Sequence, residues 1–445
     1  MHQRTSHPSA ARSSTLASAR HLLGLTSLSA VACLAGCNGD ALNLGEDTPG
    51  ADPVQESTCS VDPSSVSVFA GTQAEVDALA GCRELPGNLF IDVPEEGGEG
   101  LSLAPLAELE AVHGVLSIVG PLTSLGGLEA LELVAGLHLS ALEVSDLTPL
   151  RGLTTIIREP TYARLSGTLR IEACDRLTDL SGLENVTVWS SVILSRLDGL
   201  TTLAGLHVPP RAEEVSIGPA PQLSDASALA SLEEVAALSL FGTAITNVAG
   251  FQLETAEYLS LGGNPALTDL DGFSELQIVG DLQIAGNSAL QRIDLPRLED
   301  FDSISISGNT VLRVVPLYLT SRYGDYLQAR FGGTQAAFMR PSRLMFQVSE
   351  NPQLTSIVLP ATFYDIEQVA IYGNASLTSL DMANLQQADT LWIGDNPVLA
   401  SVDAAALQRV ADLAVMNNPA LSVAPFADVQ TFTRELTGNL DEPAP

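Results

Sequence analysis

The chain has 445 residues, of which 45% are hydrophobic and 16% are charged, and its formal net charge at pH 7 is −33. A chain this acidic repels the phosphates of nucleic acids and the head groups of anionic lipids, so we expect no nucleic-acid partner. Length alone does not fix the number of domains, because a repeat array can form a single domain of any length.

The first 36 residues contain no acidic residue, and an apolar run extends from Leu22 to Gly36. This length is typical of the hydrophobic part of a signal peptide and is short for a membrane-spanning helix. The run ends in LAGC, Leu34 to Cys37, which resembles the lipobox of bacterial lipoproteins. The alternative is an ordinary secretory signal in which Cys37 is simply a small residue.

The lipobox resemblance covers only the first 37 residues. It implies that residues 1–36 are a lipoprotein signal peptide, removed on export, and that Cys37 carries the lipid that anchors the chain to a bacterial membrane. In that family's sorting rule Asn38, the next residue, favours the outer membrane. Residues 37–58 are rich in Gly, Pro and acids, so we expect the lipidated cysteine to be followed by a disordered tether.

The pattern L-x-I-x-x-N-x-x-L recurs through the second half of the chain, for example in LQIAGNSAL from Leu282 to Leu290. Most copies follow one another by 22 or 23 residues, and looser copies extend upstream, so the pattern predicts a solenoid of about fourteen coils. The alternation L-x-I predicts one short strand per coil, stacked into a parallel sheet. The asparagines of the pattern are Asn264, Asn287, Asn309, Asn351, Asn374, Asn396 and Asn418.

These asparagines stand where each strand ends and its backbone groups lose their partners in the sheet. A side-chain amide can both donate to and accept from such groups, so we expect a structural asparagine ladder and no role in binding a ligand. In upstream coils Cys174, Ala220 and Thr243 occupy the asparagine position. Cys174 is therefore interpreted as a buried structural residue, the alternative being a nucleophile.

Two variants of one repeat family are similar to this pattern. The segment VSDLTPLRGLTTI, Val144 to Ile156, resembles the repeats of internalins, and LTDLDGFSELQIVGDLQI, Leu267 to Ile284, resembles the receptor L domain. The resemblance covers roughly residues 59–425. It implies an α/β leucine-rich-repeat solenoid with a parallel sheet, a short N-terminal helical cap and a role in binding proteins. A parallel β-helix, which has a similar period, is the alternative fold.

The segment GTQAEVDALAGC, Gly71 to Cys82, predicts the helix of that cap, with Thr72 and Glu75 as a capping box and Gly81 at its end. The resemblance to the receptor L domain implies a disulfide between Cys59 and Cys82, the alternative being two free thiols. We therefore expect a cap over residues 59–88, a solenoid over 89–425 and a C-terminal tail over 426–445.

One step between asparagines, from Asn309 to Asn351, is 42 residues long and holds an insert over residues 313–343. The insert is rich in arginine and tyrosine, the residue types that dominate binding hot spots, in an otherwise acidic chain. We interpret Arg322, Tyr323, Tyr326 and Arg330 as candidate contacts for a partner. The alternative is a degenerate repeat whose arginines pair with local acids.

A second candidate surface lies near the C-terminus. Tyr372, Trp392 and Met416 come from three consecutive coils, at or beside the outward strand position, and predict a small apolar patch. The alternative is that these side chains cap the last coils.

No catalytic constellation stands out in the sequence. The three histidines after the signal peptide, His113, His138 and His207, fall on different coils and lack the spacing of metal ligands. We therefore expect no enzyme activity, no cofactor and no metal. The predicted function is a lipid-anchored cell-envelope module that binds or scaffolds proteins. The alternatives are a purely structural envelope protein and a carbohydrate-active β-helix enzyme.

Overall fold

The computed structural model describes Cys59 and residues 66–94, 100–158, 166–188, 190–315, 344–359 and 365–441. They belong to one compact unit, Glu56–Pro445. Among the described residues no helix is both long and apolar enough to cross a membrane. The predicted signal peptide, Cys37 and the tether lie outside the described residues.

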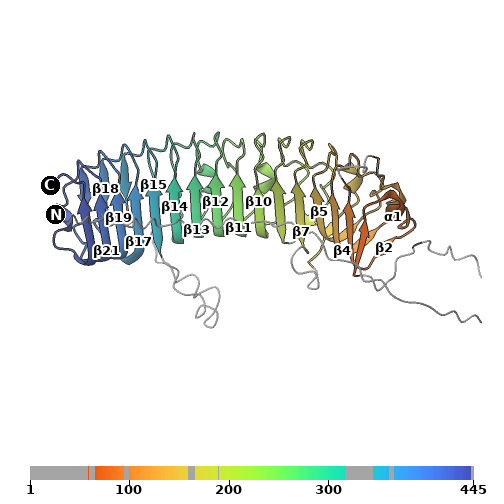
Figure 1. Ribbon diagram of the computed structural model, residues 1–445, viewed down its shortest axis with the longest axis horizontal. Coiled ribbons are helices and arrows are strands. Elements are labelled where there is room, and N and C mark those ends of the chain that lie inside the picture. The colour runs from red at the N-terminus through yellow and green to blue at the C-terminus, as the bar shows by residue number, and fades with distance from the viewer. Residues whose placement is uncertain are drawn as a thin grey trace, which may run out of the picture. The chain divides into compact units, whose positions relative to one another are not determined.

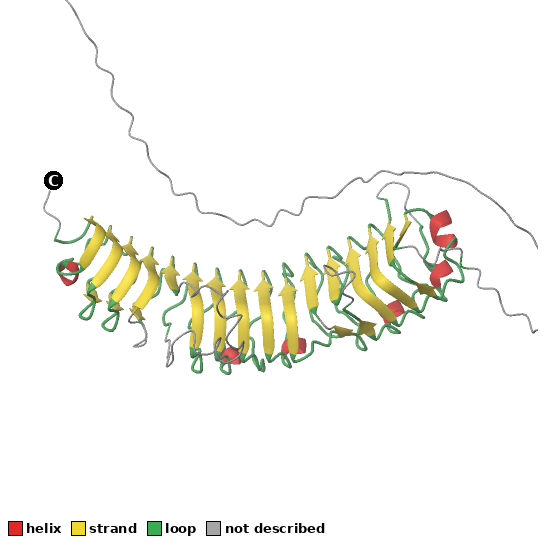
Figure 2. Ribbon diagram, turned by 90° about the horizontal axis from the view of Figure 1, so that it is seen from below, coloured by secondary structure: helices red, strands yellow, loops and turns green. Residues whose placement is uncertain are grey.

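The compact unit is a solenoid of about 15 turns, built around one parallel sheet. Its strands lie side by side in a single row, and the row is curved (Figures 1 and 2). The strands of the row are β1 (Ser67–Ala70), β3 (Asn88–Asp92), β4 (Ala111–Val119), β5 (Leu133–Ser140), β7 (Thr168–Glu172), β9 (Ser191–Ser195), β10 (Arg211–Ile217), β11 (Glu234–Phe241), β12 (Thr255–Gly262), β13 (Ile278–Ala285), β14 (Asp300–Ser307), β15 (Met345–Ser349), β17 (Asp365–Tyr372), β19 (Gln387–Gly394), β21 (Arg409–Met416) and β22 (Gln430–Thr437). Three short strands belong to the same sheet in its N-terminal coils: β2 (Glu84–Leu85) pairs with the start of β4, β6 (Thr155–Ile156) pairs with the start of β5, and β8 (Thr187–Val188) pairs with β6.

The register of the sheet confirms the repeat alignment. The second apolar residue of each L-x-I pattern pairs with the equivalent residue of the next coil, as Ile284 does with Ile306. The looser upstream copies obey the same register, since Ile118 pairs with Leu139 and Leu139 with Ile171. All five side chains are fully buried. The hydrophobic core is therefore one continuous column that runs inside the coils.

The return side of the coils contains almost no α-helix. The only α-helix among the described residues is α1 (Gln73–Asp77), and several coils turn back through short 3-10 turns instead. In the turn at Thr148–Leu150, Pro149 occupies the first turn and Asp146 accepts a hydrogen bond from the Thr148 N–H at 2.7 Å. The predicted α/β description is wrong in this respect, because a coil of 22 residues leaves too short a return segment for a helix.

A second, three-stranded parallel sheet lies in the C-terminal coils, formed by β16 (Ser356–Val358), β18 (Ser379–Asp381) and β20 (Ser401–Asp403). A parallel β-helix would carry such a second strand along its whole length. In the part of the chain that the structure describes, this second sheet joins three coils. The architecture is therefore the leucine-rich-repeat solenoid and not the β-helix.

The asparagine ladder has the predicted structural role. Asn287 is fully buried, its Oδ1 accepts the backbone N–H of Asn264 at 3.0 Å, and its Nδ2 donates to the carbonyl of Leu261 at 2.9 Å. All seven predicted asparagines are 0% exposed. At the upstream end Thr243 occupies the ladder position before Asn264. Its backbone N–H and its hydroxyl both donate to Asn264 Oδ1.

The ladder continues one coil beyond the predicted end. Asn439 Nδ2 donates to the carbonyl of Val415 at 2.7 Å, and β22 pairs with β21 along its whole length. The expected boundary at residue 425 is therefore too early. The repeat is hard to see in the sequence because Arg434 stands at an inward position, in register with the core residue Leu413.

The residue before many of the ladder positions adopts a left-handed backbone. Gly263, Gly286 and Gly308 have φ between 61° and 67°, a region that glycine enters without steric cost. Ala141 and Ala173 take the same conformation, with φ of 57° and 51°. Since a Cβ clashes with the carbonyl oxygen there, these two alanines store backbone strain.

The N-terminal cap has the predicted construction. The Thr72 side chain accepts from the Glu75 N–H, and Glu75 accepts from the Thr72 N–H, which completes the capping box of α1. Gly81 has a φ of 75°, and Cys59 is bonded to Cys82. The sheet begins inside the predicted cap, because β1 pairs in parallel with β3.

Candidate functional site

The predicted contacts of the insert, Arg322, Tyr323, Tyr326 and Arg330, lie outside the described residues. Among the described residues, the outward face of the sheet is the candidate site, because its side chains alternate along each strand with those of the core. The register places one outward side chain of each strand in a common row, which includes Ser239, Ser260, Gln283, Ser305, Gln347, Ala370 and Trp392.

Two residues of the second predicted patch are in contact on this face. The rings of Tyr372 and Trp392 are stacked, with their centroids 4.4 Å apart and their planes 16° from parallel. The Tyr372 hydroxyl accepts a hydrogen bond from Gln347 Nε2 at 3.2 Å. Met416 stands two strands away from Tyr372, because Gly394 lies between them in the register. Tyr372 and Trp392 are in contact, and Met416 lies in the same register row as Tyr372; the role of all three in binding remains a prediction.

Gly394 explains how the indole reaches its position. A Cβ on this glycine would lie 2.6 Å from Trp392 Nε1, which is too close for any non-bonded pair of heavy atoms. The absence of a side chain at Gly394 thus allows Trp392 to lie against its own strand. The same indole nitrogen is buried and has no hydrogen-bond partner among the described residues. The indole is therefore held by packing, whereas the phenol ring is also held by its hydrogen bond from Gln347.

A further aromatic side chain on this face was not identified from the sequence. Phe241, at the end of β11, is 51% exposed, and a Cβ on Gly262 would lie 3.0 Å from its ring. The ring therefore lies against the backbone of β12. On the neighbouring strands the Tyr258 hydroxyl donates to Gln283 Oε1 at 3.1 Å. These residues could have been found by writing out the outward letter of each repeat.

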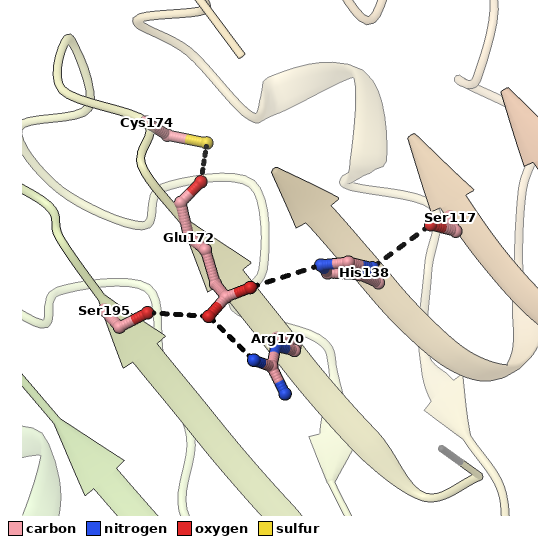
Figure 3. A network of polar contacts seen from close by, with 6 residues as sticks. All are labelled: Ser117, His138, Arg170, Glu172, Cys174 and Ser195. Atoms are coloured by element: carbon pink, nitrogen blue, oxygen red, sulfur yellow. Dashed lines mark hydrogen bonds and ion pairs between the residues drawn. The ribbon is translucent and has the colours of Figure 1, made fainter. Parts of the chain in front are cut away.

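A polar network occupies the N-terminal third of the same face (Figure 3). Its centre is Glu172, at the end of β7, whose Oε1 accepts from Arg170 at 2.8 Å and from Ser195 at 2.9 Å. His138 on β5 places Nε2 3.5 Å from Glu172 Oε2 and Nδ1 3.1 Å from the Ser117 hydroxyl. The register of parallel strands brings these side chains together from four coils.

The charge states in this network follow from burial and from the neighbouring groups. Burial, followed by the positive charge of Arg170, lowers the pKa of His138. Burial alone raises the pKa of Glu172, but the hydrogen bonds from Arg170 and Ser195 outweigh it, and the net shift is downward. At neutral pH the network therefore contains a carboxylate paired with a guanidinium and a neutral imidazole.

The order serine, histidine, carboxylate is that of a nucleophilic triad, but the geometry here does not present a nucleophile. Ser117 is only 6% exposed, so its hydroxyl cannot meet a substrate without movement of the strands. Cys174 is also buried, and burial raises the pKa of its thiol to about 11, which keeps the sulfur protonated. In the described ranges no three His, Cys, Asp or Glu side chains lie together as a possible metal site.

The single row of parallel strands, the inward L-x-I side chains and the asparagine ladder define a leucine-rich-repeat solenoid. No family model matches the sequence, and no curated protein matches it. Similar solved structures include an internalin from Listeria monocytogenes, with 14% identity over 84% of this chain and 90% of that chain and a TM-score of 0.32. A leucine-rich-repeat protein from Leptospira interrogans has 14% identity over 77% of this chain and 94% of that chain, with a TM-score of 0.30.

A third structure, a leucine-rich-repeat protein from Bacteroides ovatus, has 11% identity over 82% of this chain and 87% of that chain, with a TM-score of 0.25. These values are low, and the assignment of the fold rests on the strands, the register and the ladder of this chain itself.

Proposed function

We propose that this protein is a binding module of the bacterial cell envelope, and that it holds a protein partner on the outward face of its sheet. The observation that carries the proposal is the stacked pair of Tyr372 and Trp392 on the outward face of the sheet. Tryptophan and tyrosine are the residue types most enriched in the energetic centres of protein interfaces.

The anchors are also ordered before a partner arrives. Gln347 donates a hydrogen bond to the Tyr372 hydroxyl, and Gly394, which has no side chain, leaves the space that the indole of Trp392 occupies. A side chain that is already immobilised loses less conformational entropy on binding, so more of its contact energy appears as affinity. The rigid sheet beneath keeps the two rings in place relative to the rest of the face.

The cellular location is part of the proposal. The LAGC sequence ending at Cys37 supports a lipid anchor, and Asn38 supports the outer membrane. Residues 38–58 then serve as the link between the lipid and the folded unit. Such an arrangement allows the solenoid to meet partners at the membrane surface while the chain itself has no part in the bilayer.

The test uses immobilised chains that begin at residue 38 and an envelope extract. Wild type is compared with the double variant Tyr372→Ala/Trp392→Ala, and with Val358→Ala, which removes an apolar side chain that is 54% exposed on the other sheet. We expect a protein that wild type and Val358→Ala retain and the double variant loses, with all three chains melting at similar temperatures. Equal retention by all three would refute the assigned surface.

A further inference from the structure

We infer that the partner meets this face with an uncharged surface centred on Gln283, Ser305 and Gln347, so that binding does not use the chain's large negative charge. The inference rests on the proposed function and specifies the chemistry of its partner. Three observations carry it: the distribution of charge over the sheet, the hydrogen-bonding of the two glutamines, and the aromatic rings at either side.

Charge is missing from two adjacent rows of the face in an otherwise strongly acidic chain, which has 53 Asp and Glu residues. From β11 to β17 the outward row reads Ser239, Ser260, Gln283, Ser305, Gln347 and Ala370. The row at the strand ends reads Phe241, Gly262, Ala285, Ser307, Ser349 and Tyr372. None of these positions is charged, and acids appear one row nearer the strand starts, at Asp281.

At the centre of the face two glutamine amides lie on either side of a serine, and each amide is hydrogen-bonded to one tyrosine hydroxyl. Gln283, Ser305 and Gln347 are direct neighbours in the register of β13, β14 and β15. Tyr258, on the strand before, donates to the Gln283 amide, while Tyr372, on the strand after, accepts from the Gln347 amide. Each amide is thus oriented by one tyrosine and keeps further hydrogen-bonding capacity towards a partner.

Apolar rings stand on both sides of this centre. Phe241 is half exposed on the side of β11, and the Tyr372–Trp392 pair stands on the side of β17 and β19. The strands from β11 to β17 span five interstrand steps, or about 24 Å at the spacing of a sheet. That width is suited to the contact patch of a folded protein.

The lack of charge selects the partner's chemistry. A Lys, Arg, Asp or Glu side chain pressed onto these two rows would lose its hydration and find no opposite charge within them, which is an unfavourable exchange. A surface of hydroxyls, amides, backbone groups and apolar side chains incurs no such penalty, because the glutamines and serines can pair with its polar groups. Affinity for such a surface should vary little with salt, since screening acts on charges.

The experiment places the photo-reactive residue benzoylphenylalanine at Ala285, which borders the centre without taking part in it, in a chain that begins at residue 38. The probe is an envelope fraction, cross-linked at about 50 mM and about 500 mM NaCl, a range over which the screening length shortens roughly threefold. A second substitution is added in parallel: Ser305→Asp on the face, or Ser356→Asp as the control at an exposed position of β16. Melting curves verify that each variant folds.

We expect one protease-sensitive adduct whose yield changes less than about twofold with salt, falls at least about tenfold with Ser305→Asp, and is unchanged with Ser356→Asp. A steep fall with salt, or indifference to Ser305→Asp, overturns the inference and leaves the proposed function standing. An adduct with a glycan instead of a protein overturns both. Failure to form any adduct overturns the inference alone if the Tyr372/Trp392-dependent partner is still retained, and both if it is not.

Discussion

Asn309 and Asn287 are joined by two hydrogen bonds to one atom: Asn309 Oδ1 accepts the backbone N–H of Asn287 at 3.0 Å and its side-chain Nδ2 at 3.3 Å. Asn309 Nδ2 in turn donates to the carbonyl of Ile284. Each asparagine thus satisfies backbone groups of the preceding coil while it is itself completely buried.

We therefore expect Asn309→Ala to destabilise the solenoid by about 1–3 kcal/mol, because it leaves buried donors and an acceptor unpaired. Urea unfolding followed by circular dichroism measures the change. Asn185→Ala is the matched control, since Asn185 is exposed and makes one hydrogen bond, to the carbonyl of Arg151. A loss at Asn309 no larger than that at Asn185 would contradict the ladder's structural role.

Ala141 precedes a ladder position in a left-handed backbone with φ of 57°, and its side chain is exposed. Ala141→Gly should therefore stabilise the protein by about 0.5–1 kcal/mol, since the removed strain exceeds the entropy that glycine loses on folding.

The control for that substitution is Ala107→Gly, because Ala107 is exposed and has a φ of −61°. Glycine at this position should lower the free energy of unfolding by about 0.5–1 kcal/mol. Denaturant midpoints of the two variants should move in opposite directions. Movement in the same direction would show that the left-handed conformation at residue 141 is not strained.

His138 should make stability depend on pH. Its pKa is lowered in the folded protein by burial and by Arg170, so the unfolded chain binds this proton more readily. The contribution of neutral His138 is fully present above the unfolded value of about 6.5 and is lost as pH falls below it. Glu172, whose pKa is also lowered, adds a further loss only below its ordinary value of 4.5.

The measurement compares urea midpoints of wild type and His138→Gln between about pH 7.5 and about pH 5, above the window of Glu172. The urea midpoint of wild type should exceed that of His138→Gln by less as the pH falls. His113→Gln controls for the loss of an exposed imidazole, that of His113, which lies 3.3 Å from Glu84. A difference between wild type and His138→Gln that stays constant across this range would be inconsistent with a buried, neutral His138.

Cys37→Ser should release the protein from the membrane. If the lipid on Cys37 is the anchor, its loss removes the only membrane attachment we expect, because the acyl chains supply the apolar surface. Fractionation of cells that express the variant should move the protein from the membrane to the soluble fraction. A variant found wholly in membranes would exclude this anchor.

The insert gives a separate prediction. If Arg322, Tyr323, Tyr326 and Arg330 contact a partner, alanine at these positions should weaken binding by on the order of 2 kcal/mol at a true hot spot and leave melting unchanged. If they belong to a degenerate repeat, the same substitutions should lower the melting temperature. Calorimetric titration with the captured partner, together with melting curves, separates the two outcomes.

The spacing of residues along the chain was enough to predict the solenoid, its core and its ladder. The L-x-I alternation and the step of 22 or 23 residues determine which side chains face inward, because a strand alternates faces and each coil repeats its neighbour. For the same reason the capping box at Thr72 and the turn at Gly81 could be read directly, since both depend on residues a few positions apart. The last coil was not predicted, because Arg434 interrupts the apolar pattern.

The tertiary structure decided which outward side chains meet. His138, Glu172 and Ser195 lie on different coils, and Tyr372 touches Trp392 from the next coil, so their contacts depend on side-chain orientation across strands. A glycine at 394 and a glutamine at 347 look unremarkable in the sequence, yet they orient the aromatic pair through space. Register brings such residues to within reach, but packing across the sheet determines how they lie.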